Sequence, residues 1–175
     1  MLFGDSSSFA VEAIPGPAAG LPRFVGSSLA GRVQIHVGGQ LLGDFTEPRC
    51  VFGPLAQHLT TLCASSAAFW HESLDGLAPP AIFEMLDRAL FQGQDEPYPP
   101  VFDLMGFLTN VSECFDNVKG FVAAPRAGIL LVLAQLQPSG RLISHEIAVA
   151  QWAAASASFA AWLHEQERTH GASEA

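Results

Sequence analysis

The chain has 175 residues, of which 49% are apolar and 14% are charged. A chain of this length and composition can bury a hydrophobic core without disulfides or metal, which excludes an intrinsically disordered protein. The formal net charge is −9 and Lys119 is the single lysine, so we expect no phosphate-neutralising patch and no nucleic-acid partner. The long apolar stretch at residues 147–163 is mostly alanine and serine with Gln151 inside it, which predicts an interior helix and no membrane span.

The N-terminal residues predict strands. Residues 8–14 alternate apolar with other side chains, as a strand does, and the PGPAAGLP run at 15–22 predicts a loop. Residues 23–37 predict a half-buried strand with one solvated face. The alternation that indicates this strand is formed by Arg32, Gln34 and His36 on one face and Val33, Ile35 and Val37 on the other.

A glycine pair then predicts a β-hairpin. Gly38 and Gly39 can both adopt positive φ, which the two central positions of a tight primed turn require. The apolar run at 40–45 supplies the returning strand. We therefore expect both glycines to have a structural role.

The middle of the chain predicts helices. Residues 52–70 place Leu55, Leu59, Leu62, Ser66 and Phe69 on one face. Residues 80–92 predict a second helix, since two prolines precede it and Phe83, Leu86 and Leu90 share a face. The GQDEPYPP run at 93–100 predicts a loop, and residues 101–114 fit either a short helix or irregular structure.

The C-terminal third predicts a meander followed by a helix. Three short apolar runs at 115–123, 128–136 and 142–148 are separated by turn residues. The last helix has Trp152, Ser156, Phe159 and Leu163 on one face.

The order of these elements indicates an α+β fold, because a parallel sheet would need strict alternation of strands and helices. We expect one domain over residues 1–175, with an antiparallel sheet built from N-terminal and C-terminal hairpins and packed with about three helices. Its parts are the N-terminal hairpins at 1–47, a helical middle at 51–111, and the meander and helix at 115–170.

Motifs for catalysis and metal binding are not found in the sequence. The dipeptides His71-Glu72 and His145-Glu146 lack the second histidine of a zinc helix, and there is no phosphate loop or nucleophile elbow. We therefore predict no metal and no cofactor. The three cysteines are widely spaced, which indicates core packing in a reducing compartment; they are Cys50, Cys63 and Cys114.

The acidic residues are unevenly distributed. Residues 51–111 contain seven acidic residues and one basic residue. These acids are Glu72, Asp75, Glu84, Asp87, Asp95, Glu96 and Asp103. A solvated face is one interpretation of such a run, and a negative surface that attracts a basic protein is the other.

Tyr98, the only tyrosine, lies between two prolines in the same region and has the character of a stiff aromatic anchor. The partner-binding surface is thus predicted to include Asp75, Glu84, Asp87, Asp95, Glu96, Tyr98 and Asp103.

Three segments carry a resemblance to a known family. Residues 2–12 read LFGDSSSFAVE, residues 35–44 read IHVGGQLLGD, and residues 115–122 read FDNVKGFV. They resemble the opening strand, the glycine-turn hairpin with its GD pair, and the FD-x-x-K strand of immunity family 42 of the bacterial polymorphic toxin systems. Family members carry a tryptophan-rich stretch before the glycine turn, and residues 29–35 depart from this pattern.

The resemblance implies a non-enzymatic protein that binds a cognate toxin and blocks it in the producing cell and its kin. Together with the charge, it leads us to expect stoichiometric binding of a basic toxin domain, such as a nuclease whose cleft attracts phosphate. The N-terminus has Asp5 and no basic residues before its apolar run, so we expect no secretory signal and a cytoplasmic location.

Two alternatives from other classes remain open. The first is a small hydrolase whose site is assembled from sequence-distant residues, such as His36 or His145 with a nearby acid. The second is a self-associating adaptor that uses the alanine-rich helix at 149–163 as its interface, and a homo-oligomer is compatible with either role. A pocket with paired histidine and carboxylate would favour the hydrolase, and a mostly buried helix would count against the adaptor.

Overall fold

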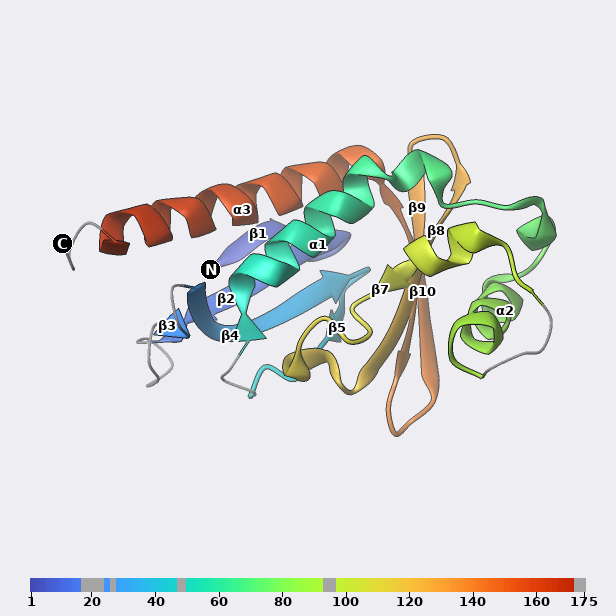
Figure 1. The fold of residues 1–175 in the computed structure, drawn as a ribbon, viewed down its shortest axis with the longest axis horizontal. Coiled ribbons are helices and arrows are strands. Elements are labelled where there is room, and N and C mark those ends of the chain that lie inside the picture. The colour runs from blue at the N-terminus through green and yellow to red at the C-terminus, as the bar shows by residue number, and fades with distance from the viewer. Residues whose placement is uncertain (17–23, 26–27, 47–49, 93–96, 172–175) are drawn as a thin grey trace.

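The computed structural model describes residues 1–16, 24–25, 28–46, 50–92 and 97–171 (Figure 1). Its helices are α1 (Phe52–Ala64), α2 (Pro79–Phe91) and α3 (Val149–Gly171). Its strands are β1 (Leu2–Asp5), β2 (Phe9–Pro15), β3 (Phe24–Val25), β4 (Ser28–Val37), β5 (Gln40–Leu42), β6 (Cys50–Val51), β7 (Gly106–Phe107), β8 (Val118–Arg126), β9 (Ile129–Leu136) and β10 (Arg141–Ala148). Short 3-10 turns are η2 (Ser66–Ala68), η3 (Glu72–Leu74), η4 (Pro100–Leu104) and η5 (Glu113–Phe115).

The N-terminal strands form a first antiparallel sheet around β4. The order is β1-β2-β4-β3, and β5 and β6 also pair with β4. The register sets Val11 opposite Ile35, so the apolar positions of β2 and β4 share one face. Gly38 and Gly39 have φ of 56° and 74°, which confirms the predicted tight turn between β4 and β5.

Helices α1 and α3 lie side by side over one face of this sheet (Figure 1). The predicted face of α3 is confirmed, since Trp152, Ser156, Phe159 and Leu163 are all buried. The Trp152 ring stacks on Phe9 of β2 with 4.1 Å between centroids, and its Nε1 donates a hydrogen bond to the Leu59 carbonyl of α1 at 3.0 Å. Trp152 therefore joins both helices to the sheet.

The C-terminal strands form a second antiparallel sheet in the order β10-β9-β8-β7, which confirms the predicted meander. Residues 130–134 of β9 are all buried, so both faces of this strand are covered. Helix α2 packs on one face, where Phe83 meets Phe121 of β8 edge to face at 5.2 Å. Helix α2 thus lies on the side of the second sheet that faces away from the first sheet (Figure 1).

The two sheets meet at the β4–β5 hairpin. A β-carbon on Gly38 would lie 2.7 Å from the His145 ring on β10, and Arg141 donates a hydrogen bond to Gln40 at 2.7 Å. A glycine is required at position 38 both for its positive φ and for this close approach.

A second contact of the junction joins the hairpin to η5. The Asp44 amide donates a hydrogen bond to the Cys114 carbonyl at 2.7 Å. A β-carbon on Gly43 would lie 2.7 Å from the Phe115 ring. These contacts involve the GD pair and the FD pair on which the family resemblance rests, so both pairs lie at the junction of the sheets.

The α+β class and the three described helices agree with the prediction from the sequence. The N-terminal and C-terminal hairpins form two separate sheets. The first central helix is shorter than predicted: α1 ends at Ala64, and residues 66–68 form a 3-10 turn. The chain leaves the helix because Phe69 joins the second sheet, where its carbonyl accepts the Ala124 amide at 2.7 Å. Helix α2 lies within one residue of its predicted bounds.

Residues 101–114, which fitted two interpretations, contain the end of η4, strand β7 and the start of η5. The predicted solvated face of β4 is only partly solvated, because Gln34 is buried and donates a hydrogen bond to Glu12 at 2.6 Å. The predicted loops at 15–22 and 93–100 extend outside the described residues, at 17–22 and 93–96.

Candidate functional site: an acidic groove beside α2

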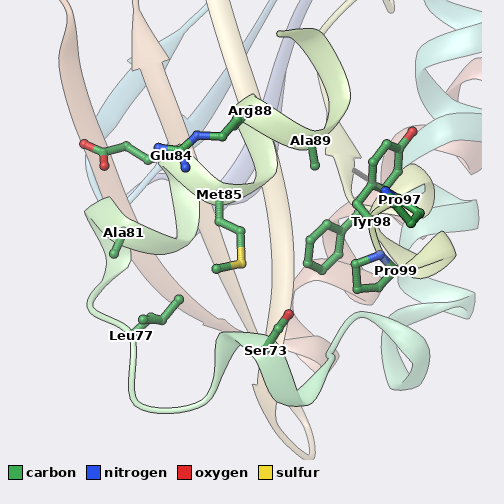
Figure 2. A pocket seen from close by; sticks show the side chains of 11 residues that line it. Ser73, Leu77, Ala81, Glu84, Met85, Arg88, Ala89, Pro97, Tyr98 and Pro99 are labelled. Carbon is green, nitrogen blue, oxygen red and sulfur yellow. The ribbon is translucent and has the colours of Figure 1, made fainter. Parts of the chain in front are cut away.

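A groove of about 500 Å³ lies between α2 and the segment that precedes η4. One wall is a stripe of α2 and the other consists of Pro97, Tyr98 and Pro99 (Figure 2). We call this site the α2 groove; it is lined by Ser73, Leu77, Ala81, Glu84, Met85, Arg88, Ala89, Pro97, Tyr98, Pro99 and Phe102. Its size falls within the roughly 300–1,000 Å³ of typical ligand pockets.

Ala81, Met85 and Ala89 line the α2 wall because they are spaced by four residues and share a helix face. The two alanines are short, so Met85 is the side chain that projects from this wall (Figure 2). Phe102 is buried, and together with Leu77 it gives the groove an apolar surface.

Tyr98 is held in place on the opposite wall. Its ring stacks on Phe102 with 6.3 Å between centroids and 9° between planes, and its hydroxyl donates a hydrogen bond to Asp103 Oδ1 at 2.9 Å. This hydrogen bond raises the pKa of the Tyr98 phenol, which keeps the ring neutral. The side chain is 37% exposed, so a partner can contact it without displacing protein atoms.

Asp87 differs from the other candidate acids. Its side chain is 14% exposed, and Oδ1 accepts an ion-paired hydrogen bond from Lys119 Nζ at 2.7 Å. Gln92 donates to the other carboxylate oxygen at 2.8 Å, and Lys119 lies over the Phe91 ring at 5.2 Å. Asp87 therefore ties α2 to β8, and its negative charge is balanced locally.

Two other described acids lie at the groove and form an acidic rim. We define this rim as Glu84, which lines the groove, and Asp103, whose Oδ1 accepts the hydroxyl of the lining residue Tyr98. Glu72 and Asp75 do not line the groove, and Asp75 accepts at 2.8 Å from the indole of Trp70, which lines a smaller cavity beside β10. Among the described residues that line the groove, Arg88 is the one basic residue. The predicted site residues Asp95 and Glu96 lie outside the described residues.

The histidines of the hydrolase alternative occupy other places. His36 Nε2 lies 2.9 Å from Glu12 Oε2 on the first sheet, and neither residue lines the α2 groove or either of two smaller cavities, one beside β10 and one at the β8–β9 turn. His145 lines the cavity beside β10, where the neighbouring Glu146 carboxylate is bonded to Arg126 instead.

Within the described ranges, no three His, Cys, Asp or Glu side chains gather as a metal site would need. None of the described helices is long and apolar enough to cross a membrane.

Sequence reasoning identified the charged and aromatic members of the site but missed its apolar lining. Met85, Ala81 and Ala89 form a four-residue repeat that a helical plot of 80–92 would have placed on one face. The same plot does not indicate that Tyr98 and Phe102 lie opposite α2. Helical spacing gives no information on how a helix packs against a later segment of the chain.

The chain is a small α+β protein with two antiparallel sheets and an acid-rimmed groove. It belongs to the immunity protein 42 family, whose model matches residues 1–145. This membership confirms the resemblance seen in the sequence and supports a toxin-neutralising immunity role. No curated protein and no solved structure matched the chain.

Proposed function

We propose that the protein neutralises a cognate bacterial toxin by stoichiometric binding, with the acidic rim of the α2 groove as part of the contact surface. The protein acts by occupying the toxin in the cytoplasm of the cell that makes it, without catalysis. Family membership supports the immunity role, and the rim is the observation that supports this surface.

The charge of the rim favours a basic partner. Two carboxylates that form no ion pair with a described residue, those of Glu84 and Asp103, lie at a groove that contains one guanidinium, in a chain with a net charge of −9. Such a field raises the rate of association with a basic surface and disfavours acidic partners. A nuclease domain fits this description, because its cleft must attract phosphate, and acids placed over that cleft would exclude the substrate.

The test is protection in cells combined with binding in solution. The cognate toxin domain is expressed with and without the protein, and the complex is measured by calorimetry. Rescue of growth and a one-to-one complex are expected. Absence of growth rescue or of the one-to-one complex would contradict neutralisation by binding. If Glu84→Arg bound the toxin with unchanged affinity, the contact surface would lie away from the groove.

The two alternatives are tested in the same assay. If the protein acted as a hydrolase through its histidine and carboxylate pair, His36→Ala and Glu12→Gln would abolish protection while binding persisted. The adaptor alternative is disfavoured by the burial of Trp152 and Phe159 against the first sheet. Sedimentation of the protein alone measures any self-association.

A further inference from the structure

The α2 groove combines an apolar interior with a charged edge. Ala81, Met85 and Ala89 form one side, and Pro97, Tyr98 and Pro99 form the other (Figure 2). Segments that border the groove also contain exposed apolar side chains, with Leu104 of η4 54% exposed. Exposed apolar surface rimmed by polar residues is typical of a protein interaction site.

Resting on the proposed function, we infer that the groove receives a single large apolar side chain from a basic segment of the toxin. The occupant is thus a lysine- or arginine-rich loop with an aromatic or long aliphatic residue between its basic residues.

The apolar part of this inference follows from the lining. A large side chain entering the groove would contact Met85 and the Tyr98 ring, and the short Ala81 and Ala89 leave space for it. Methionine adapts its shape to an incoming group, and aromatic anchors seated in a pocket contribute strongly at interfaces.

The basic part follows from the balance of charge at the edge. Asp87 contributes little, because Lys119 already neutralises it. Glu84 lines the groove and forms no hydrogen bond or ion pair with another described residue. Asp103 accepts the Tyr98 hydroxyl on the opposite wall and adds a second carboxylate, so cations beside the anchor would find an acceptor on each side of the groove.

The opening is also preorganised. Tyr98 lies between prolines, stacks on Phe102 and is hydrogen-bonded to Asp103, so little side-chain freedom is lost when a partner contacts it. A rigid wall opposite an adaptable methionine suits the insertion of one side chain.

Methionine methyl NMR tests the chemistry of the groove without the toxin. The chain has three methionines: Met85 lines the groove, Met105 is fully buried, and Met1 is at the N-terminus. The probes are the blocked peptides Lys-Trp-Lys and Glu-Trp-Glu at millimolar concentration. We expect Lys-Trp-Lys to shift the Met85 signal while Met105 stays unchanged, and Glu-Trp-Glu to shift it much less. Equal shifts with both peptides, or none with either, would overturn the inference.

A groove-filling variant tests the inference with the toxin. Ala89→Trp occupies the groove, and Ala154→Trp on the exposed face of α3 is the matched control. We expect Ala89→Trp to dissociate from the toxin domain about tenfold faster or more, and the control to behave as the wild type.

The two failures can be told apart. If wild-type protein binds the toxin and Ala89→Trp binds equally well with an unchanged melting temperature, the groove is not the anchor site although the proposed function stands. If the wild type does not bind the toxin, the proposed function fails, while the peptide experiment still decides the chemistry of the groove.

Discussion

The ring of His145 lies against Gly38, so that an added β-carbon would be 2.7 Å from the ring Cγ. This contact joins the hairpin turn of the first sheet to the edge strand of the second. Gly39, the next residue, also has positive φ but faces open space. Substitutions at these two glycines therefore distinguish the free-energy cost of backbone strain from that of a steric clash between the sheets.

Gly39→Ala is expected to lower the free energy of unfolding by about 1 kcal/mol, because a side chain at positive φ is strained. Gly38→Ala adds a clash with His145, and we expect it to cost roughly 1–3 kcal/mol more. Urea unfolding of both variants measures the difference. In a His145→Ala background the extra cost of Gly38→Ala should disappear, and its persistence would contradict packing of the ring on this glycine.

A second prediction concerns α3, which lies beyond the end of the family match at residue 145. Trp152 stacks on Phe9 and donates a hydrogen bond to the Leu59 carbonyl, so this helix completes the core of the first sheet. Trp152→Ala is expected to lower the free energy of unfolding by roughly 3–5 kcal/mol. A change below about 1 kcal/mol, comparable to that of a surface substitution, would show that the core does not depend on α3.

The hydrogen bond of Trp152 can be measured separately. Trp152→Phe keeps an aromatic ring but removes the indole hydrogen bond to the Leu59 carbonyl, and should cost less than Trp152→Ala. Ser158→Ala, at an exposed position on the same helix, is the control and should change stability by less than about 0.5 kcal/mol.

A third prediction concerns pH. His58 on α1 is largely buried, its Nε2 has no hydrogen-bond partner among the described residues, and burial lowers the pKa of its ring. The His58 ring therefore binds a proton more readily in the unfolded chain than in the folded protein. The resulting stability is fully present above the unfolded pKa of about 6.5 and is lost as pH falls through the lower folded value.

The wild type should thus lose stability between about pH 8 and about pH 5, and His58→Gln should lose less. Glu12 serves as an internal comparison, because hydrogen bonds from Gln34 and His36 lower the pKa of its carboxyl group. Its contribution is present above about pH 4.5 and is lost only in more acidic solution. If the free energy of unfolding of His58→Gln and of the wild type shows the same pH dependence, His58 is not the group that destabilises the protein at lower pH.

Local sequence periodicity predicted most of the helices and strands. The remaining features depend on contacts between residues that are far apart in the sequence. The alternation at residues 33–37 and the spacing from Trp152 to Leu163 define faces that become buried whatever their partners are. The same patterns do not determine which strands pair. They therefore do not predict that the N-terminal and C-terminal hairpins form two separate sheets. The end of α1 at Ala64 depends on the hydrogen bond between Phe69 and Ala124, which are 55 residues apart in the printed sequence.

The candidate site shows the same division. The excess of acids at 51–111 is visible in the sequence, but the pairing of Asp87 with Lys119 across 32 residues is not. A count of charges therefore treats Asp87 and Glu84 alike, whereas the fold neutralises one and exposes the other at the groove.

The last prediction separates steering from anchoring at the toxin interface. Glu84→Arg should slow association, and Arg88→Glu, one helical turn away, should accelerate it, because rim charges act through the long-range field. Double reversal of Asp95 and Glu96 is expected to act in the same direction as Glu84→Arg. All these effects should shrink as salt rises, since the Debye length falls to about 3 Å at 1 M salt.

Tyr98→Ala should instead leave association nearly unchanged, accelerate dissociation and cost about 2 kcal/mol of binding free energy. Tyr98→Phe keeps the ring stacked on Phe102 and removes only the hydrogen bond to Asp103, so it should retain most of the affinity. Stopped-flow association and surface-plasmon dissociation rates with the toxin domain distinguish the two roles. If Tyr98→Ala changed only the association rate, Tyr98 would not be an anchor. If the charge variants changed neither rate, the rim would lie outside the interface.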